Sequence, residues 1–373
     1  TLWHTLSLHD ALPISRRRGG DLVVVNAGAV LAEGVRAGAY PGGQVAVARG
    51  DRTETWVAGR LAGPGSPAVD EGTVYDLASL TKPLVTAVLL FRAVEAGACR
   101  LEDPIRRFVP EAPAVSLLDL LEHRSGLPAH LRLDRRLPPD IRPGSRAAFD
   151  HVVRDAARTA LEAPPGTRAV YSDLGFILLG AALEVMGGSL PGQLRALGCD
   201  GLLMVDRRDG DVPPPLPFAP TEGDLRGEVH DDNARAMGGV AGHAGTFGAA
   251  GAVLAAARGL VDAYHGGAGP LTPSSVRRMW APSPVAGSTR TAGWDRPSPG
   301  RSSAGRAFPP SSVGHLGFTG TSLWIEPERG LIVVFLTNRV WPRRDNEAIR
   351  EVRPALHDAA WARFVGPPAA PLG

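Results

Sequence analysis

The stretch Ser79-Leu80-Thr81-Lys82 opens the most regular helical pattern in this chain. Apolar residues recur at spacings of three and four from position 80 to position 94, and a glycine at position 97 ends the pattern. Pro83 is compatible with a helix that has this residue in its first turn, where backbone N–H groups have no intrahelical partner. The pattern therefore predicts a helix that starts at or just before Ser79, with Lys82 one turn further along the same face.

Lys82 is the single lysine among the 40 basic residues of the chain; all the others are arginines. An arginine stays protonated, whereas a buried amine can lose its proton and act as a base. Ser-x-x-Lys is the spacing at which such an amine activates a serine nucleophile. With 19 serines in 373 residues, a random lysine has a serine at this spacing about one time in twenty, so the motif needs support from the rest of the chain.

Strand and helix patterns surround this helix on both sides. Alternating residues at 43–49 and 53–59, joined by Gly50-Asp51, predict a β-hairpin, and residues 22–37 have the pattern of a helix. Near the other end, strand patterns lie at 315–319, 322–325 and 331–337, and a last helix pattern follows at 350–364. The middle of the chain reads as helical segments separated by loops rich in proline and glycine.

These elements predict an α/β (α+β) fold in which an antiparallel sheet is flanked by N- and C-terminal helices and carries a large all-α insertion. We expect residues 21–98 and 312–366 to form one discontinuous α/β sheet domain, and residues 99–311 a mainly helical domain. Residues 5–15 resemble the translation of a sequencing-library adapter, so residues 1–18 are interpreted as an artefact and left out. The true N-terminus is then missing, and a periplasmic, secreted or cytoplasmic location stays open.

Composition narrows the class of protein. The hydrophobic content of 44% is typical of a globular chain, and a net charge of +2 indicates no nucleic-acid partner. No apolar run reaches the roughly 18 residues of a membrane span. Cys99 and Cys199 are too few for a disulfide framework and form no metal-binding pattern. Composition therefore favours a globular protein with no nucleic-acid partner and no membrane span; the oligomeric state is not predicted.

Four separated motifs, in this order, resemble those of penicillin-binding proteins and class C β-lactamases. They are Ser79-Leu80-Thr81-Lys82, the helix-and-loop at residues 120–128, Tyr171-Ser172-Asp173 for the family's Tyr-x-Asn, and His315-Leu316-Gly317 for its Lys-Thr-Gly. The His-x-Gly form is common among related esterases and peptidases. Residues 228–243 resemble a subgroup near D-Ala-D-Ala carboxypeptidases and family VIII-type esterases. The resemblance spans residues 21–366 and implies a β-lactamase/transpeptidase-like fold.

Carried over to this chain, the resemblance implies acyl transfer from a small-molecule or peptidoglycan-derived acyl substrate, with no metal or cofactor. Ser79 attacks a carbonyl, Lys82 accepts its proton, and Tyr171 relays that proton to the leaving group. The backbone N–H groups of Ser79 and Phe318 form the oxyanion hole. Because free lysine has a pKa of about 10.4, we expect the surroundings of Lys82 to lower its pKa.

The departures from the family pattern concern Asp173, His315 and Leu316, which with Gly317 belong to the substrate-binding or supporting positions. Asp173 replaces an asparagine and either adds a negative charge to the site or caps the helix that follows. His315 replaces a permanent cation and Leu316 replaces a hydroxyl residue that helps to bind a substrate carboxylate. Both changes favour an ester or small amide over a β-lactam as substrate.

Several alternatives remain open at this stage. Within enzymes, the chain could be a D-Ala-D-Ala carboxypeptidase or a weak β-lactamase. From another class, it could be a non-catalytic module that binds a cell-wall fragment or a penicillin. His230, Asp231, Asp232 and His243 could be metal ligands, but their spacing fits no standard motif and favours polar loop groups or local caps.

Overall fold

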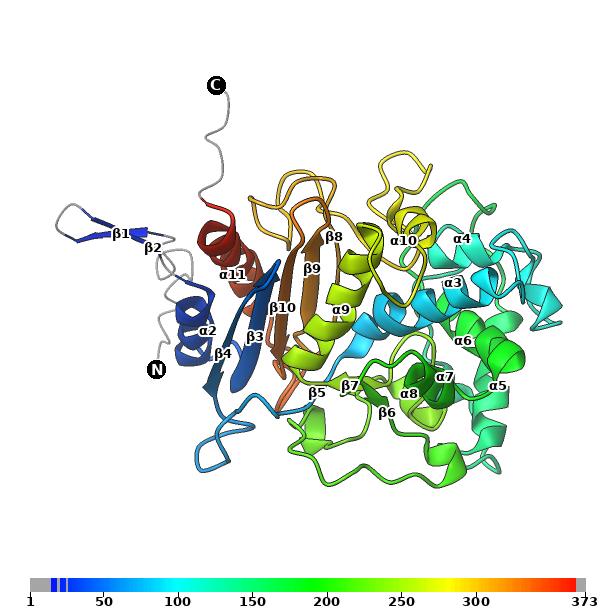
Figure 1. Ribbon diagram of the computed structural model, residues 1–373. Helices are drawn as coiled ribbons and strands as arrows, with labels where there is room; N and C mark the ends of the chain where they lie inside the picture. The colour runs from blue at the N-terminus through cyan, green and yellow to red at the C-terminus, as the bar shows by residue number, and fades with distance from the viewer. Residues whose placement is uncertain (1–14, 19–20, 25, 367–373) are drawn as a thin grey trace.

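A five-stranded antiparallel sheet forms the centre of the computed structural model, which describes residues 15–18, 21–24 and 26–366. Its strands, in spatial order, are β4 Arg52–Gly59, β3 Gly42–Arg49, β10 Leu331–Thr337, β9 Ser322–Glu326 and β8 Val313–Leu316. Figure 1 shows that the first and last parts of the chain meet in this sheet. The hairpin at 43–59 and the three late strands were predicted, and the fold class is confirmed.

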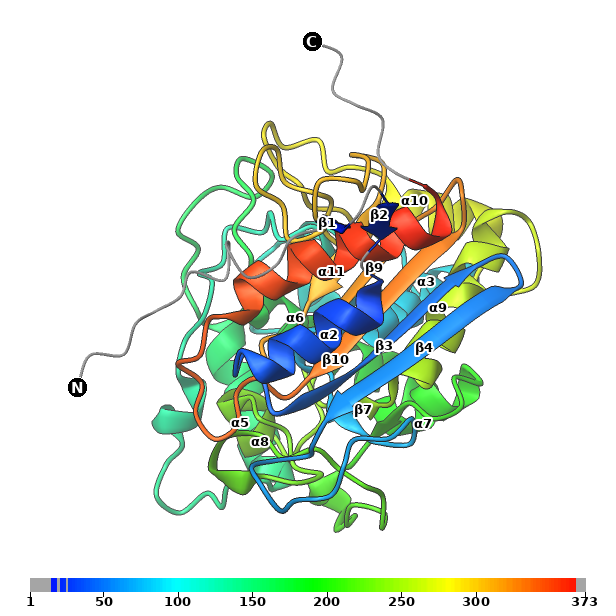
Figure 2. The ribbon, with the colours of Figure 1, turned by 90° about the vertical axis from the view of Figure 1, so that its left-hand side faces the viewer.

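Apart from the edge strand β4, which is largely exposed, the sheet is buried on both faces, with side chains alternating between two cores. Val45 and Val47 of β3 and Phe335 of β10 pack on the N- and C-terminal helices, α2 Ala27–Arg36 and α11 Ile349–Phe364. These helices lie side by side over one face (Figure 2). The intervening residues, such as Ala46 and Val334, face the core that includes α9 Ala250–Tyr264 and α3 Val88–Glu95.

The N-terminal helix is shorter than predicted. It begins at Ala27, because Asn26 caps it by accepting a hydrogen bond from the backbone N–H of Ala29. Residues 22–24 lie instead in β2 Asp21–Val24, which pairs with β1 Ser15–Arg18. Three consecutive valines at 23–25 favour an extended backbone over a helix. Of the segment interpreted as an artefact, residues 1–14 lie outside the described part of the chain.

The middle of the chain is mostly helical. Its helices are α4 Leu117–Leu121, α5 Arg146–Ala157, α6 Asp173–Gly187, α7 Leu190–Ala196, α8 Asp232–Ala236, α9 and α10 Pro273–Trp280. It also contributes β6 Leu203–Met204 and β7 Thr246–Gly248, which join β5 Tyr75–Asp76 in a small sheet. These strands were not predicted within the all-α insertion, since two or three residues are too few to show alternation. The division into sheet and helical domains stays a prediction.

Within the described residues, no single helix is long and apolar enough to cross a membrane. Helices α6 and α7 reach that length and composition together, but the chain bends by 70° between them. Residues 174–183 of α6 are buried in the protein core.

Candidate active site

Ser79 lies on a short 3₁₀ turn, Ala78–Leu80, at the start of the helix that was predicted around it. The backbone continues through a π-helical turn, Lys82–Ala87, before it becomes the regular helix α3 at Val88. Pro83 has no N–H to donate, so the first turns of this helix cannot follow the ordinary hydrogen-bond pattern. The helical start before Ser79 agrees with the prediction, whereas regular α-helix begins nine residues later than Ser79.

The backbone just before the nucleophile is held in an unusual conformation. Ala78 has a φ of 48°, in the left-handed region that residues with a Cβ rarely adopt. The carboxylate of Asp76 accepts hydrogen bonds from the backbone N–H groups of Ala78, at 2.8 Å, and of His230, at 2.7 Å. Burial raises the pKa of Asp76 to about 6, while these two bonds oppose the rise. Asp76 was not predicted to belong to the site, because in the sequence it is an ordinary acidic residue at the end of a strand.

Lys82 is completely buried beneath the nucleophile. Its Nζ lies 2.9 Å from Ser79 Oγ, 2.8 Å from Asp173 Oδ1 and 3.0 Å from the carbonyl oxygen of His243. Three acceptors match the three protons of an ammonium group. Burial lowers the pKa of Lys82, but Asp173 and Tyr171 outweigh it and leave this pKa raised. The expectation that the surroundings lower the pKa of Lys82 is therefore wrong, because it left the charge of Asp173 out of account.

Asp173 is the first residue of α6, and its carboxylate turns toward Lys82 and away from the helix end. One oxygen pairs with Lys82, and the other lies 3.2 Å from Nδ1 of His130, which is half-exposed. Burial raises the pKa of Asp173, yet Lys82 and His130 outweigh this effect and hold the pKa well below its usual range. The helix N-cap is Ser172, and no side-chain capping bond forms. Of the two predicted roles, the added negative charge is the one observed.

Tyr171 completes the group around the nucleophile. Its hydroxyl interacts with the side chains of Ser79 and Lys82, and its ring centroid lies 5.0 Å from Lys82 Nζ. Burial raises the pKa of Tyr171, Asp173 adds to the rise, and Lys82 opposes it. The phenol is therefore protonated at neutral pH and can donate a proton.

His315 is neutral in this site. Its Nδ1 lies 2.8 Å from the carbonyl oxygen of Leu316, and its Nε2 is buried with no partner among the described residues. Burial, together with the nearby charges of Lys82 and Arg290, lowers the pKa of His315 to about 3. The position that carries a permanent cation in the related enzymes is thus uncharged here.

The turn after β8 approaches the nucleophile closely. A Cβ at Gly317 would lie only 2.6 Å from the carbonyl oxygen of Leu77, so this position requires glycine. The following Phe318 is 50% exposed. Its ring lies 5.6 Å from that of His230 and 4.7 Å from the guanidinium of Arg339. The predicted oxyanion-hole residue therefore sits at the cavity wall beside a cation.

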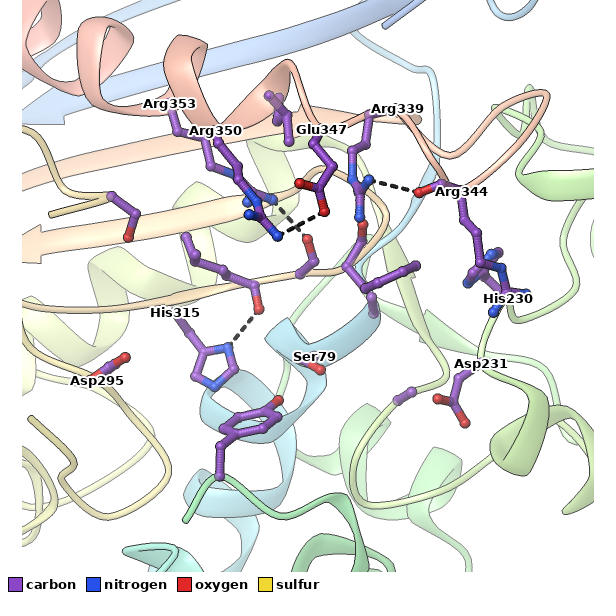
Figure 3. Close-up of a pocket in the computed structure, with 18 of the residues that line it drawn as sticks. Ser79, His230, Asp231, Asp295, His315, Arg339, Arg344, Glu347, Arg350 and Arg353 are labelled. Atoms are coloured by element: carbon purple, nitrogen blue, oxygen red, sulfur yellow. Dashed lines mark hydrogen bonds and ion pairs between the residues drawn. The ribbon is translucent and has the colours of Figure 1, made fainter. Parts of the chain in front are cut away.

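A cavity of about 1040 Å³ brings the predicted residues together. Ser79, Tyr171, Asp173, His315, Gly317 and Phe318 all line it, while Lys82 lies beneath its floor. Figure 3 shows Ser79 and His315 below a wall that carries Arg339, Arg350 and Arg353. The sequence analysis missed this arginine wall, since arginines spread over a loop and a helix form no motif.

The four candidate metal ligands make local hydrogen bonds instead. Asp231 is the N-cap of α8, where it accepts from the backbone N–H of Ala234, and its Oδ1 lies 2.8 Å from Nε2 of His243. Asp232 pairs with Arg235, and the backbone N–H of His230 donates to Asp76. Over the described residues, no group of three His, Cys, Asp or Glu side chains is arranged to hold a metal ion. Asp231 acts as the local cap that the preferred interpretation predicted.

Comparisons with known proteins show which family this chain resembles. The family model described as Beta-lactamase matches residues 28–357. A protein of Escherichia coli (strain K12) that carries the provisional name D-alanyl-D-alanine carboxypeptidase is 28% identical over 312 residues, which are 72% of this chain and 69% of that protein.

Two solved structures share the fold. SurE with D-Leu aligns with a TM-score of 0.70 and 23% identity, over 93% of this chain and 77% of the other. EstCE1, described as a hydrolase with promiscuous acyltransferase activity, aligns with a TM-score of 0.68 and 22% identity, over 89% of this chain and 97% of the other. These likenesses confirm the predicted β-lactamase-like fold.

Proposed function

Because this chain belongs to the Beta-lactamase family and is therefore a serine hydrolase, we propose that it cleaves an ester or small amide through an acyl-enzyme on Ser79. The single observation that carries the proposal is the position of Lys82, whose Nζ lies 2.9 Å from Ser79 Oγ in full burial. A nucleophile with a base in hydrogen-bond reach, itself oriented by a third group, is the arrangement that acyl transfer needs.

In the resting site Lys82 is an ammonium, so it must lose a proton before it can accept one from Ser79. Transfer of an Nζ proton to Asp173 Oδ1, 2.8 Å away, runs uphill against the raised pKa of Lys82 and the lowered pKa of Asp173. Part of that cost is offset because the two neutral groups that result are cheaper to keep away from water than the ion pair. The neutral amine then takes the hydroxyl proton while Ser79 Oγ forms a bond to the substrate carbonyl carbon. The proton of Ser79 thus ends on the Lys82–Asp173 pair.

Tyr171 acts next as the acid. Its neutral phenol, kept protonated by burial, donates its proton to the leaving group as the tetrahedral intermediate collapses to the acyl-enzyme. The Lys82–Asp173 pair then returns a proton to the phenolate oxygen. Water attacks the acyl-enzyme through the same groups in reverse order, which releases the acid and restores Ser79.

The wall formed by β8 supports an uncharged substrate. His315 is neutral and Leu316 is apolar, so this strand offers a carboxylate neither a fixed cation nor a hydroxyl. The exposed ring of Phe318 adds apolar surface beside the nucleophile. An ester or small amide with an apolar acyl group fits these residues.

The first test is hydrolysis of p-nitrophenyl acetate and butyrate by the parent protein and its Lys82→Arg variant. Arginine keeps the charge but cannot deprotonate, so we expect the variant to lose about 100-fold or more in kcat. Arg36→Lys, an exposed exchange in the opposite direction at the end of α2, serves as the control and should leave the rate unchanged. Equal rates in parent and Lys82→Arg would exclude Lys82 as the base.

A second candidate, D-Ala-D-Ala carboxypeptidase, is favoured by the arginines that line the cavity around the turn after β8. Arg339, Arg350 and Arg353 line it beside Gly317, and guanidinium groups suit a terminal carboxylate. The relative from Escherichia coli carries the name of this activity. Release of D-alanine from diacetyl-Lys-D-Ala-D-Ala with a higher kcat/KM than that for the butyrate ester would favour the carboxypeptidase.

Two further outcomes separate the remaining alternatives. Turnover of nitrocefin at a rate comparable to that of the esters would indicate a β-lactamase. Covalent labelling by a fluorescent penicillin, with a stoichiometric burst and no turnover of any substrate, would favour a binding module.

A further inference from the structure

Arg353 is a buried guanidinium with no acidic partner. It lies on α11, is 7% exposed, and no carboxylate within the described residues forms an ion pair with it. Its Nε has no hydrogen-bond partner there either. Burial, with the neighbouring charges of Arg339 and Arg350, lowers the pKa of Arg353 to about 9, so it is still charged at neutral pH. A buried charge without an opposite charge beside it costs stability unless polar groups solvate it.

The hydrogen bonds of Arg353 point to the oxyanion hole. Its Nη2 donates to the carbonyl oxygen of Gly317 at 2.8 Å and to that of Thr321 at 2.9 Å. The carbonyl of Gly317 and the N–H of Phe318 belong to one peptide group, which is conjugated from end to end. A cation that binds the oxygen of such a group withdraws electrons from its nitrogen and makes the N–H a stronger donor.

The same turn has other supports, so its position does not depend on Arg353 alone. Thr319 Oγ1 donates to the carbonyl of Asp76 at 2.7 Å, and Thr321 Oγ1 to that of Leu77 at 3.1 Å. Arg339 Nε donates to the carbonyl of Phe318 at 2.9 Å. Loss of Arg353 would therefore weaken the polarisation of the peptide more than it would move the turn.

We propose that Arg353 is a positioning residue that strengthens the oxyanion hole by polarising the Gly317–Phe318 peptide group from its carbonyl side. The tetrahedral intermediate carries a full negative charge on oxygen, whereas the substrate carbonyl carries only a partial one. The polarised N–H and the cation behind it therefore stabilise the transition state more than the bound substrate. This inference rests on the proposed acyl transfer at Ser79.

The test compares Arg353→Met and Arg353→Lys with the full-length parent, using p-nitrophenyl butyrate. We expect Arg353→Met to lose about 10- to 100-fold in kcat, less than the loss of a whole oxyanion donor, with KM nearly unchanged. Arg353→Lys keeps the charge and should recover part of the loss. Arg363→Met, at the exposed far end of the same helix and paired with Glu54, is the control.

Two readouts separate polarisation from a structural effect. Phenylboronic acid forms a tetrahedral anion on Ser79, so its affinity should fall in parallel with kcat in the Met variant. The carbonyl stretch of the acyl-enzyme in infrared difference spectra should move to higher frequency, because a weaker oxyanion hole polarises the ester carbonyl less. Unchanged boronate affinity and carbonyl frequency in Arg353→Met, or an unchanged kcat in that variant, would overturn the inference.

Failure of the proposed function has a different signature. A parent protein that forms no acyl-enzyme and hydrolyses no ester would remove the premise, and the inference with it. An active parent with Arg353 variants that match it would overturn the role of Arg353 alone. If Arg353→Met does not fold, the carbonyl frequency of the Arg353→Lys acyl-enzyme decides the outcome.

Discussion

A carboxylate at position 173 changes which groups carry charge around the nucleophile. Asp173 Oδ1 lies 2.8 Å from Lys82 Nζ; the lysine side chain is fully buried, and that of Asp173 is 16% exposed. An asparagine there would leave Lys82 without an anionic partner, and burial would then favour the neutral amine. The residue therefore decides whether Lys82 acts alone as a base or only together with its partner.

Asp173→Asn should shift the acidic limb of the pH profile of kcat/KM for p-nitrophenyl butyrate to lower pH. Asp173 raises the pKa of Lys82 and also that of Tyr171, so its removal lowers both. Lys82 is then deprotonated, and able to act as a base, at a lower pH. Asp232→Asn removes another carboxylate from the same cavity, one that pairs with Arg235, and should leave the limb in place. An unmoved limb in Asp173→Asn would contradict the coupling.

At the scale of elements, close approach between α6 and the loop after α8 sets the geometry of Lys82. A Cβ on Gly180 would lie 2.6 Å from the backbone nitrogen of Gly242. Thr86 Oγ1 donates to the carbonyl of Gly242, and Lys82 donates to that of His243. Because neither Gly180 nor Gly242 has a side chain, the loop lies close to α6 and brings a backbone acceptor to the buried amine.

Gly180→Ala should lower the free energy of unfolding by about 2 kcal/mol, because the added methyl group forces two backbones apart. It should also lower kcat, since the carbonyl of His243 moves with its loop. Gly251→Ala in α9, where a Cβ would meet nothing within 4 Å, should instead raise the free energy of unfolding by up to about 1 kcal/mol. Urea denaturation followed by circular dichroism measures the free energy of unfolding of each variant. A Gly180→Ala variant that is stabilised as Gly251→Ala is would contradict the close approach.

At the scale of the whole molecule, some histidines are buried in the neutral form, so the stability of the protein depends on pH. His357 is completely buried between Ser322 Oγ and the carbonyl of Ser303, and burial lowers its pKa to about 3. A lowered folded-state pKa means that this contribution to stability is present above the unfolded-state pKa of about 6.5 and is lost as the pH falls toward 3. His315 behaves in the same way.

We expect His357 alone to remove about 2 kcal/mol from the free energy of unfolding between pH 7.5 and pH 5. Urea denaturation at the two pH values measures the loss. His357→Gln keeps hydrogen-bonding groups without a titrating ring, so the difference between the two pH values should be smaller in this variant. A variant with the same pH dependence as the parent would show that another group is responsible.

Local patterns determined much of the architecture. The continuous apolar run at 331–337 and the apolar periodicity after Ser79 depend on neighbours close in the chain, so strand β10 and the start of the nucleophile helix could be predicted. The spacing of Ser79 and Lys82 is likewise local. The strands of the small sheet could not be predicted in this way, because they depend on pairing with distant strands. The exact start of α2 could not be predicted either, because the cap at Asn26 decides it.

By itself the sequence determined the family motifs, the fold class and the identity of Ser79, Lys82 and Tyr171 as candidates, since each rests on residue types at fixed spacings. Only the tertiary structure decided the charge of Lys82, because the carboxylate of Asp173, far along the chain, lies 2.8 Å from its Nζ. The contact between Arg353 and Gly317 likewise joins residues that are far apart in the chain. Hydrogen bonds and burial act through space, so protonation states and peptide polarisation follow from the packed structure and not from any local pattern.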